Sequence, residues 1–179
     1  MIMKSLSLAI TFGVLALLST SCQSEETSLY TGREVRYPLI EGSLFDQETA
    51  GTLIARERND QSVEVIVDLS GTSEQAVHPV HLHFGSLGED QPVAAWLSPL
   101  EDMGDGKSQS ITRLDHLHND DPLTFDLFTE MDGSVKIHFE ESGQWEDVIL
   151  GATNIGRNYD VTDATRYQDI ATCNGRTNL

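Results

Sequence analysis

From Tyr37 onward the chain is a succession of short apolar or alternating runs separated by turn residues, and no long segment has helical periodicity. The clearest strand is 62–70, where every second residue is apolar. These residues are Val63, Val65, Val67 and Leu69. A strand with one apolar face needs a second sheet to cover it. Further strands are predicted at 52–58, 78–84, 93–97, 108–114, 134–139 and 147–152. This spacing predicts an all-β fold, a Greek-key sandwich or barrel of about eight antiparallel strands.

Two longer stretches lie between the predicted strands. Residues 99–107 contain Gly104-Asp105-Gly106 and are typical of a turn-rich connection. Residues 115–133 are too long for a tight turn. Within them, 122–131 is predicted to form a short helix or an irregular strand.

The strand at 78–84 carries three of the six histidines of the chain. Successive side chains of a strand point to opposite faces, so His81 and His83 share one face while Val80 and Leu82 share the other. Two imidazoles on one face, backed by an apolar layer, predict part of a metal site for copper or zinc. The alternative is the polar face of a half-buried strand without a metal.

The later histidines are His116, His118 and His138. Strand 108–114 returns toward the end of the fold where 78–84 finishes, and it delivers the first two of these residues there. If 115–133 crosses to the far end, strand 134–139 runs back and brings His138 to the same place. All six histidines are then expected to converge, whereas a simple hairpin would carry His138 away.

Length and composition indicate one soluble domain, with 179 residues, 39% hydrophobic and 7% aromatic residues. Acidic residues outnumber basic ones by 29 to 11, and the net charge is −18. The Lys and Arg clusters needed to bind nucleic acid or anionic lipid are absent from the sequence. A solvated acidic surface is the simplest interpretation, and such a surface also attracts cations.

The N-terminal segment predicts export. Lys4 precedes an apolar run at 5–18 that is short for a transmembrane helix and typical of a signal peptide. Small residues then lead into Cys22, which resembles the lipobox of bacterial lipoproteins and predicts a signal peptide at 1–21 and lipid on Cys22. A plain secreted protein is the alternative.

Residues 22–36 are then interpreted as a polar tether, and the acidic residues just after Cys22 resemble a surface-export signal. The predicted location is the bacterial cell envelope, anchored by lipid and in the outer membrane. With Cys22 lipidated, Cys173 has no partner for an intrachain disulfide. It lies in a polar C-terminal extension, 159–179, whose role the sequence leaves open.

Three motifs of the chain carry a family resemblance. They are His78-Pro79-Val80-His81-Leu82-His83, the segment 135–142 (Val-Lys-Ile-His-Phe-Glu-Glu-Ser) and the segment 154–158 (Asn-Ile-Gly-Arg-Asn). Over about 37–158 the chain resembles the copper/zinc superoxide dismutase-like β-sandwich superfamily, and more closely small bacterial lipoproteins with a CHRD domain. The resemblance implies His81, His83 and His138 as copper ligands. A fourth ligand is then His118, His116 or water, and His78 forms a hydrogen bond nearby.

The chain also departs from the dismutases. The loop 85–91 has no histidine to bridge to zinc, so zinc is the less favoured metal. Gly151-Ala152-Thr153 stands where the dismutases have a disulfide cysteine, and Ile149 stands where they have a substrate-guiding arginine. Three functions therefore remain: a copper-binding or copper-handling envelope lipoprotein, an active superoxide dismutase, and a structural or interaction module without metal. Enzyme activity and any protein partner stay open.

Overall fold

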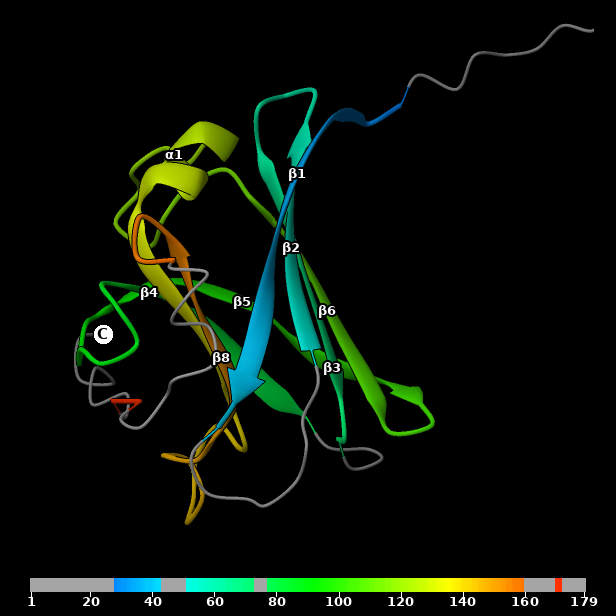
Figure 1. Cartoon of the computed structure of the whole chain (residues 1–179), viewed down its shortest axis with the longest axis vertical. Coiled ribbons are helices and arrows are strands. Elements are labelled where there is room, and N and C mark those ends of the chain that lie inside the picture. Colours follow the sequence, from blue (N-terminus) through cyan, green and yellow to red (C-terminus); the bar gives the residue numbers. More distant parts are fainter. Residues whose placement is uncertain (1–27, 43–50, 73–76, 160–169, 172–179) are drawn as a thin grey trace, which may run out of the picture.

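The computed structural model describes residues 28–42, 51–72, 77–159 and 170–171. Within these ranges eight antiparallel strands close into a barrel in the order β1-β2-β3-β6-β5-β4-β7-β8 (Figure 1). The strands are β1 (Tyr30–Glu41), β2 (Gly51–Arg58), β3 (Val63–Ser70), β4 (His78–Phe84), β5 (Val93–Gly104), β6 (Lys107–Leu114), β7 (Asp132–His138) and β8 (Ile149–Gly156). The predicted all-β Greek-key fold is confirmed. The predicted signal peptide, Cys22 and Cys173 lie outside the described residues.

The barrel is filled by the apolar face of each strand. In β3 the alternation seen in the sequence is realised, and the side chains of Val63, Val65 and Val67 have no exposed surface. The inward residues of β4 and β7 are equally buried, and they are Val80, Leu82, Val135 and Ile137. Because successive strand residues alternate, the polar residues between them must lie on the outer face of the wall.

Strand β5 is longer than the sequence indicates. It continues through Pro99 to Gly104, where a turn-rich connection is expected, and only Asp105 and Gly106 form the turn. Both turn residues have positive φ, 55° and 68°, as a two-residue type I′ hairpin requires. Strand β5 pairs with β4 as far as Leu100 and with β6 from Glu101. Pro99, which has no N–H to donate, stands beside this change of partner.

Strand β1 begins at Tyr30, inside the range 22–36 that the sequence predicts to be a polar tether. It pairs with β2 along most of its length and then, through Ile40 and Glu41, with β8. This second pairing closes the barrel. The folded body therefore starts before Tyr37. The sequence did not reveal this strand because several of its residues are charged and exposed.

The connection from β6 to β7 makes the Greek-key crossing. It contains helix α1 (Phe125–Glu130), which confirms the short helix predicted within 122–131, and Thr124 caps it by accepting a hydrogen bond from the Leu127 N–H. Phe125 and Phe128 of the helix are buried in the core. Helix α1 lies at one end of the barrel (Figure 1). No helix in the described ranges has the length and apolar character to cross a membrane.

The direction of β7 differs from the sequence-based expectation. Phe84 at the end of β4 pairs with Gly133 at the start of β7, and the two strands are antiparallel. The crossing therefore starts and ends at the same end of the barrel, and the expectation that it leads to the far end is wrong. Strand β7 nevertheless lies directly beside β4, so residues of the two strands are neighbours along the wall rather than at its end.

Candidate metal site

Two histidines of β4 face outward from the barrel wall. His81 and His83 alternate with the fully buried Val80 and Leu82, as the strand periodicity predicts. Only 2% of the His83 side-chain surface is exposed, and His81 is partly exposed. A strand has thus placed two imidazoles on one face, backed by the core.

The third histidine comes from the neighbouring strand. His81 pairs with Lys136 of β7, so His138, two residues further along, lies on the same outer face. The ring centroids of His81 and His138 are 4.7 Å apart, and those of His81 and His83 are 5.9 Å apart. One nitrogen from each of the three rings lies within 4.8 Å of the others. The structure therefore brings together His81, His83 and His138.

Main-chain carbonyls orient two of the three rings. The His83 Nδ1–H donates to the carbonyl of Gln91 at 3.0 Å, and the His138 Nδ1–H donates to the carbonyl of Glu146 at 3.1 Å. A carbonyl only accepts, so each Nδ1 carries a proton, and in the neutral ring Nε2 keeps its lone pair. This is the tautomer that metal-bound histidines adopt when a second group holds the other ring nitrogen. Two loops, after β4 and after β7, supply these carbonyls.

Burial keeps His83 neutral at physiological pH. The pKa of His83 is lowered from about 6.5 to about 4, chiefly because burial disfavours the charged ring. The hydrogen bond to Gln91 acts in the opposite direction, and the nearby charge of Lys136 lowers the pKa further. A neutral imidazole is the form that binds a metal ion, so near pH 7 protons do not compete with a metal ion for this ring.

The metal-free protein is expected to lose stability as the pH falls. The pKa of His83 is lower in the folded chain than in the unfolded chain, so the unfolded state binds the proton first, below pH 6.5. This residue contributes no penalty above that pH, and it lowers the free energy of unfolding by about 2 kcal/mol between pH 7 and pH 5. Urea unfolding at both pH values measures the loss, which His83→Gln should reduce and His116→Gln should leave unchanged. An equal loss in the His83→Gln chain would contradict this assignment.

The other three histidines do not join this group. His118 packs edge-on against Trp96, with ring centroids 4.2 Å apart. His116 is exposed, and its Nδ1 forms a hydrogen bond with the carboxylate of Asp115. His78 is buried, and its Nδ1–H donates to the carbonyl of Phe139. The expected convergence of all six histidines is wrong, and in the described ranges the cluster contains three. The role of His118 as a fourth ligand stays a prediction.

The three rings fit a transition-metal ion. Imidazole nitrogens bind copper and zinc at about 2.0–2.1 Å, so ligand atoms around one ion stand about 3.3–4 Å apart. The observed limit of 4.8 Å needs only a small side-chain adjustment to reach this spacing. Among the described residues this group contains no carboxylate or thiolate. The cluster is a candidate metal site whose donors are three imidazole nitrogens.

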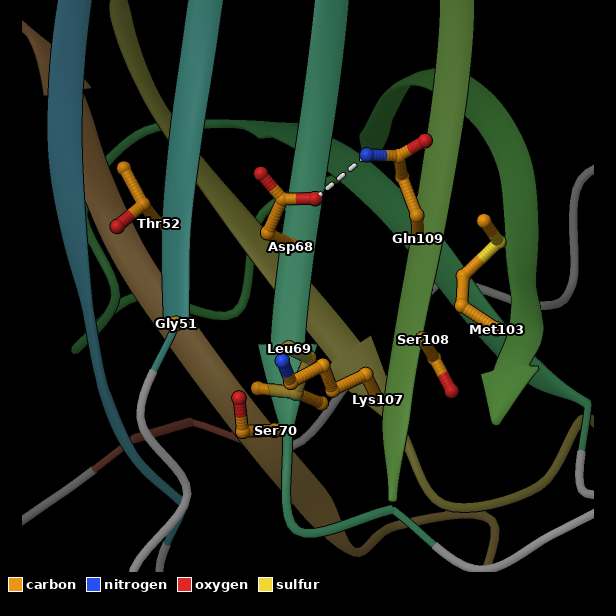
Figure 2. A pocket seen from close by; sticks show the side chains of 9 residues that line it. All are labelled: Gly51, Thr52, Asp68, Leu69, Ser70, Met103, Lys107, Ser108 and Gln109. Atoms are coloured by element: carbon orange, nitrogen blue, oxygen red, sulfur yellow. Dashed lines mark hydrogen bonds between the residues drawn. The ribbon is translucent and has the colours of Figure 1, made fainter. Parts of the chain in front are cut away.

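A separate pocket opens over the ends of β2, β3 and β6 (Figure 2). Its volume is about 490 Å³, and Asp68 and Gln109 form a hydrogen bond of 2.7 Å across two of its strands. Its remaining lining residues are Gly51, Thr52, Leu69, Ser70, Met103, Lys107 and Ser108. None of the described residues that line it is a histidine, so this pocket is distinct from the candidate metal site.

Comparison with known proteins adds no assignment: no family model, curated protein or solved structure matches this chain. The interpretation of the site therefore depends on its own residues and geometry.

Proposed function

We propose that this chain is a copper-binding lipoprotein of the bacterial cell envelope. The observation that carries the proposal is the convergence of His81, His83 and His138, with ring nitrogens within 4.8 Å of one another. Two of the rings have their Nδ1–H held by main-chain carbonyls. These two rings are therefore already oriented to present their Nε2 atoms to one ion.

Copper is preferred over zinc for two reasons. In the part of the chain that the structure describes, the cluster offers three imidazoles and no carboxylate, a donor set that suits copper in either oxidation state. The motifs of β4 and β7 resemble those that hold copper in the superoxide dismutase-like proteins. The loop 85–91 has no histidine with which a second, zinc-binding site could be completed beside the first.

Binding without turnover is the preferred role. Redox catalysis needs a position on the metal that the substrate can reach, whereas the side chains of His83 and His138 are 2% and 0% exposed. Ile149, at the position compared with a guiding arginine, is buried. A net charge of −18 also repels an anionic substrate such as superoxide. These features favour holding or transferring copper.

Anchoring is proposed from the sequence of the N-terminus. Lipid on Cys22 would hold the mature chain at a membrane, since each buried methylene contributes about 0.8 kcal/mol. The polar residues that follow would separate the barrel from the lipid surface. The acidic pair Glu25-Glu26 supports placement in the outer membrane.

One experiment tests both parts of the proposal. The full-length chain is produced in a Gram-negative bacterium grown with copper, and the membrane fraction is extracted with detergent and purified. Mass spectrometry and elemental analysis are expected to find one copper per chain and an N-terminal peptide beginning at a lipidated Cys22. A chain that retains neither copper nor zinc would overturn the metal-binding role. An unmodified N-terminus would overturn the anchor alone.

A further inference from the structure

A buried lysine lies beside the three histidines. Lys136 is 1% exposed, pairs directly with His81 across the strands and precedes His138 by two residues on the same strand. All of these side chains therefore leave the wall on its outer face. Lysine is almost never fully buried without a specific partner, so its position beside a candidate metal site requires a physical account.

Lys136 is held in place by the segment Ile170-Ala171, far along the chain, which we call the cover. Its Nζ donates to the carbonyl of Ala171 at 2.7 Å, and the N–H of Ala171 donates to the carbonyl of Leu87 at 2.9 Å. Leu87, Ile149 and Ala152 form a small apolar cluster against which Ile170 packs. The ammonium group is thus fixed within the protein, where its field is less screened than at the surface.

The charge of Lys136 acts on the site. Lys136 is directly opposite His81 in the strand register and two residues from His138 on the same outer face, and its side chain is buried. Asp90, on the exposed loop after β4, carries the opposite charge near His83. A positive charge beside these rings disfavours positive charge on an ion bound to them.

We propose that Lys136 determines which charge state of metal the site prefers, and that it favours Cu(I) over Cu(II) and Zn(II). This inference rests on the proposed metal-binding function. The three imidazoles are neutral and cannot offset the ion's charge. The repulsion between Lys136 and the ion is proportional to the charge of that ion, so a divalent ion is disfavoured about twice as strongly as a monovalent one.

The test compares ion affinities in variants that change only this charge. Lys136→Gln removes the charge and keeps an N–H donor for the Ala171 carbonyl, and Lys136→Arg keeps the charge. Lys107→Gln is the matched control, because Lys107 is exposed and lies on β6. Affinities for Cu(I), under anaerobic reducing conditions, and for Zn(II) are measured by competition with chromophoric chelators at pH 7 and fixed salt.

We expect Lys136→Gln to raise the Zn(II) affinity relative to the Cu(I) affinity by about tenfold, as loss of one nearby buried charge implies. Lys136→Arg and Lys107→Gln should keep the wild-type ratio. An unchanged ratio in a folded Lys136→Gln chain, including equal weakening of both ions, would show that Lys136 only holds the cover and would overturn the inference. Failure of the wild-type chain to bind either ion would instead overturn the proposed function.

Asp90→Asn provides a second test that does not disturb the buried lysine. It removes the opposing negative charge on an exposed loop residue, so the ratio should shift toward Cu(I), by about twofold because the group is screened by solvent. If Lys136→Gln does not fold, Lys136→Met, which keeps a long apolar side chain without the charge, takes its place: a shift toward Zn(II) supports the inference, and an unchanged ratio overturns it.

Discussion

Replacing His138 by alanine is expected to weaken copper binding by about 100-fold or more. Loss of an outer hydrogen-bonding partner of a metal ligand already costs about 10–100-fold in metal affinity, and loss of the ligand itself should cost at least the upper end of that range. His138 is the only member of the cluster that comes from β7, so its removal leaves two ligands on one strand. Competition with a chromophoric chelator measures the affinity.

His116→Ala is the matched control for this prediction. His116 is exposed, bonds Asp115 and does not belong to the cluster, so its loss should leave copper affinity unchanged. Because His138 is fully buried, circular dichroism of the metal-free variant must first show that it folds. Equal affinities for the His138→Ala and His116→Ala chains would mean that the copper is bound elsewhere.

The local geometry of this site could be predicted from the sequence, but the pairing that completes it could not. The period of a strand places His81 and His83 on one face without reference to any other part of the chain. The meeting with His138 depends on which strand lies beside β4 and in which direction it runs. That choice is made by the Greek-key crossing as a whole. The expectation of a cluster was therefore confirmed for three residues although the direction assumed for β7 was wrong.

Two further parts of the site have no signal in the sequence. The carbonyls of Gln91 and Glu146 are main-chain atoms, and any residue supplies a carbonyl. Lys136 lies between the buried Val135 and Ile137, on the face expected to meet solvent. A charged residue there is normally exposed, whereas Lys136 is buried and donates a hydrogen bond to the carbonyl of Ala171. Contacts between residues so far apart along the chain follow from the tertiary structure alone.

The remaining prediction concerns the stability of the barrel, at the residue where β8 ends. Gly156→Ala is expected to lower the free energy of unfolding by about 3 kcal/mol or more, the range of the most disruptive substitutions. Gly156 has φ of 60°, and an added Cβ would lie 2.1 Å from the carbonyl oxygen of Met131. That oxygen cannot easily move away, because it accepts a hydrogen bond from the Arg157 N–H at 3.0 Å.

Gly104→Ala separates this clash from backbone strain. Gly104 also has a positive φ, 82°, but an added Cβ would meet nothing within 4 Å. It should lose only the about 1–2 kcal/mol that a left-handed conformation costs an L-residue. Urea unfolding of the two variants measures the difference, and equal losses would show that the Met131 carbonyl yields. A larger loss at Gly156 would mean that the end of the crossing is rigid. Because β7 starts at that point, beside the end of β4, the same rigidity would fix the register that sets Lys136 opposite His81 and places His138 two residues further along the same face.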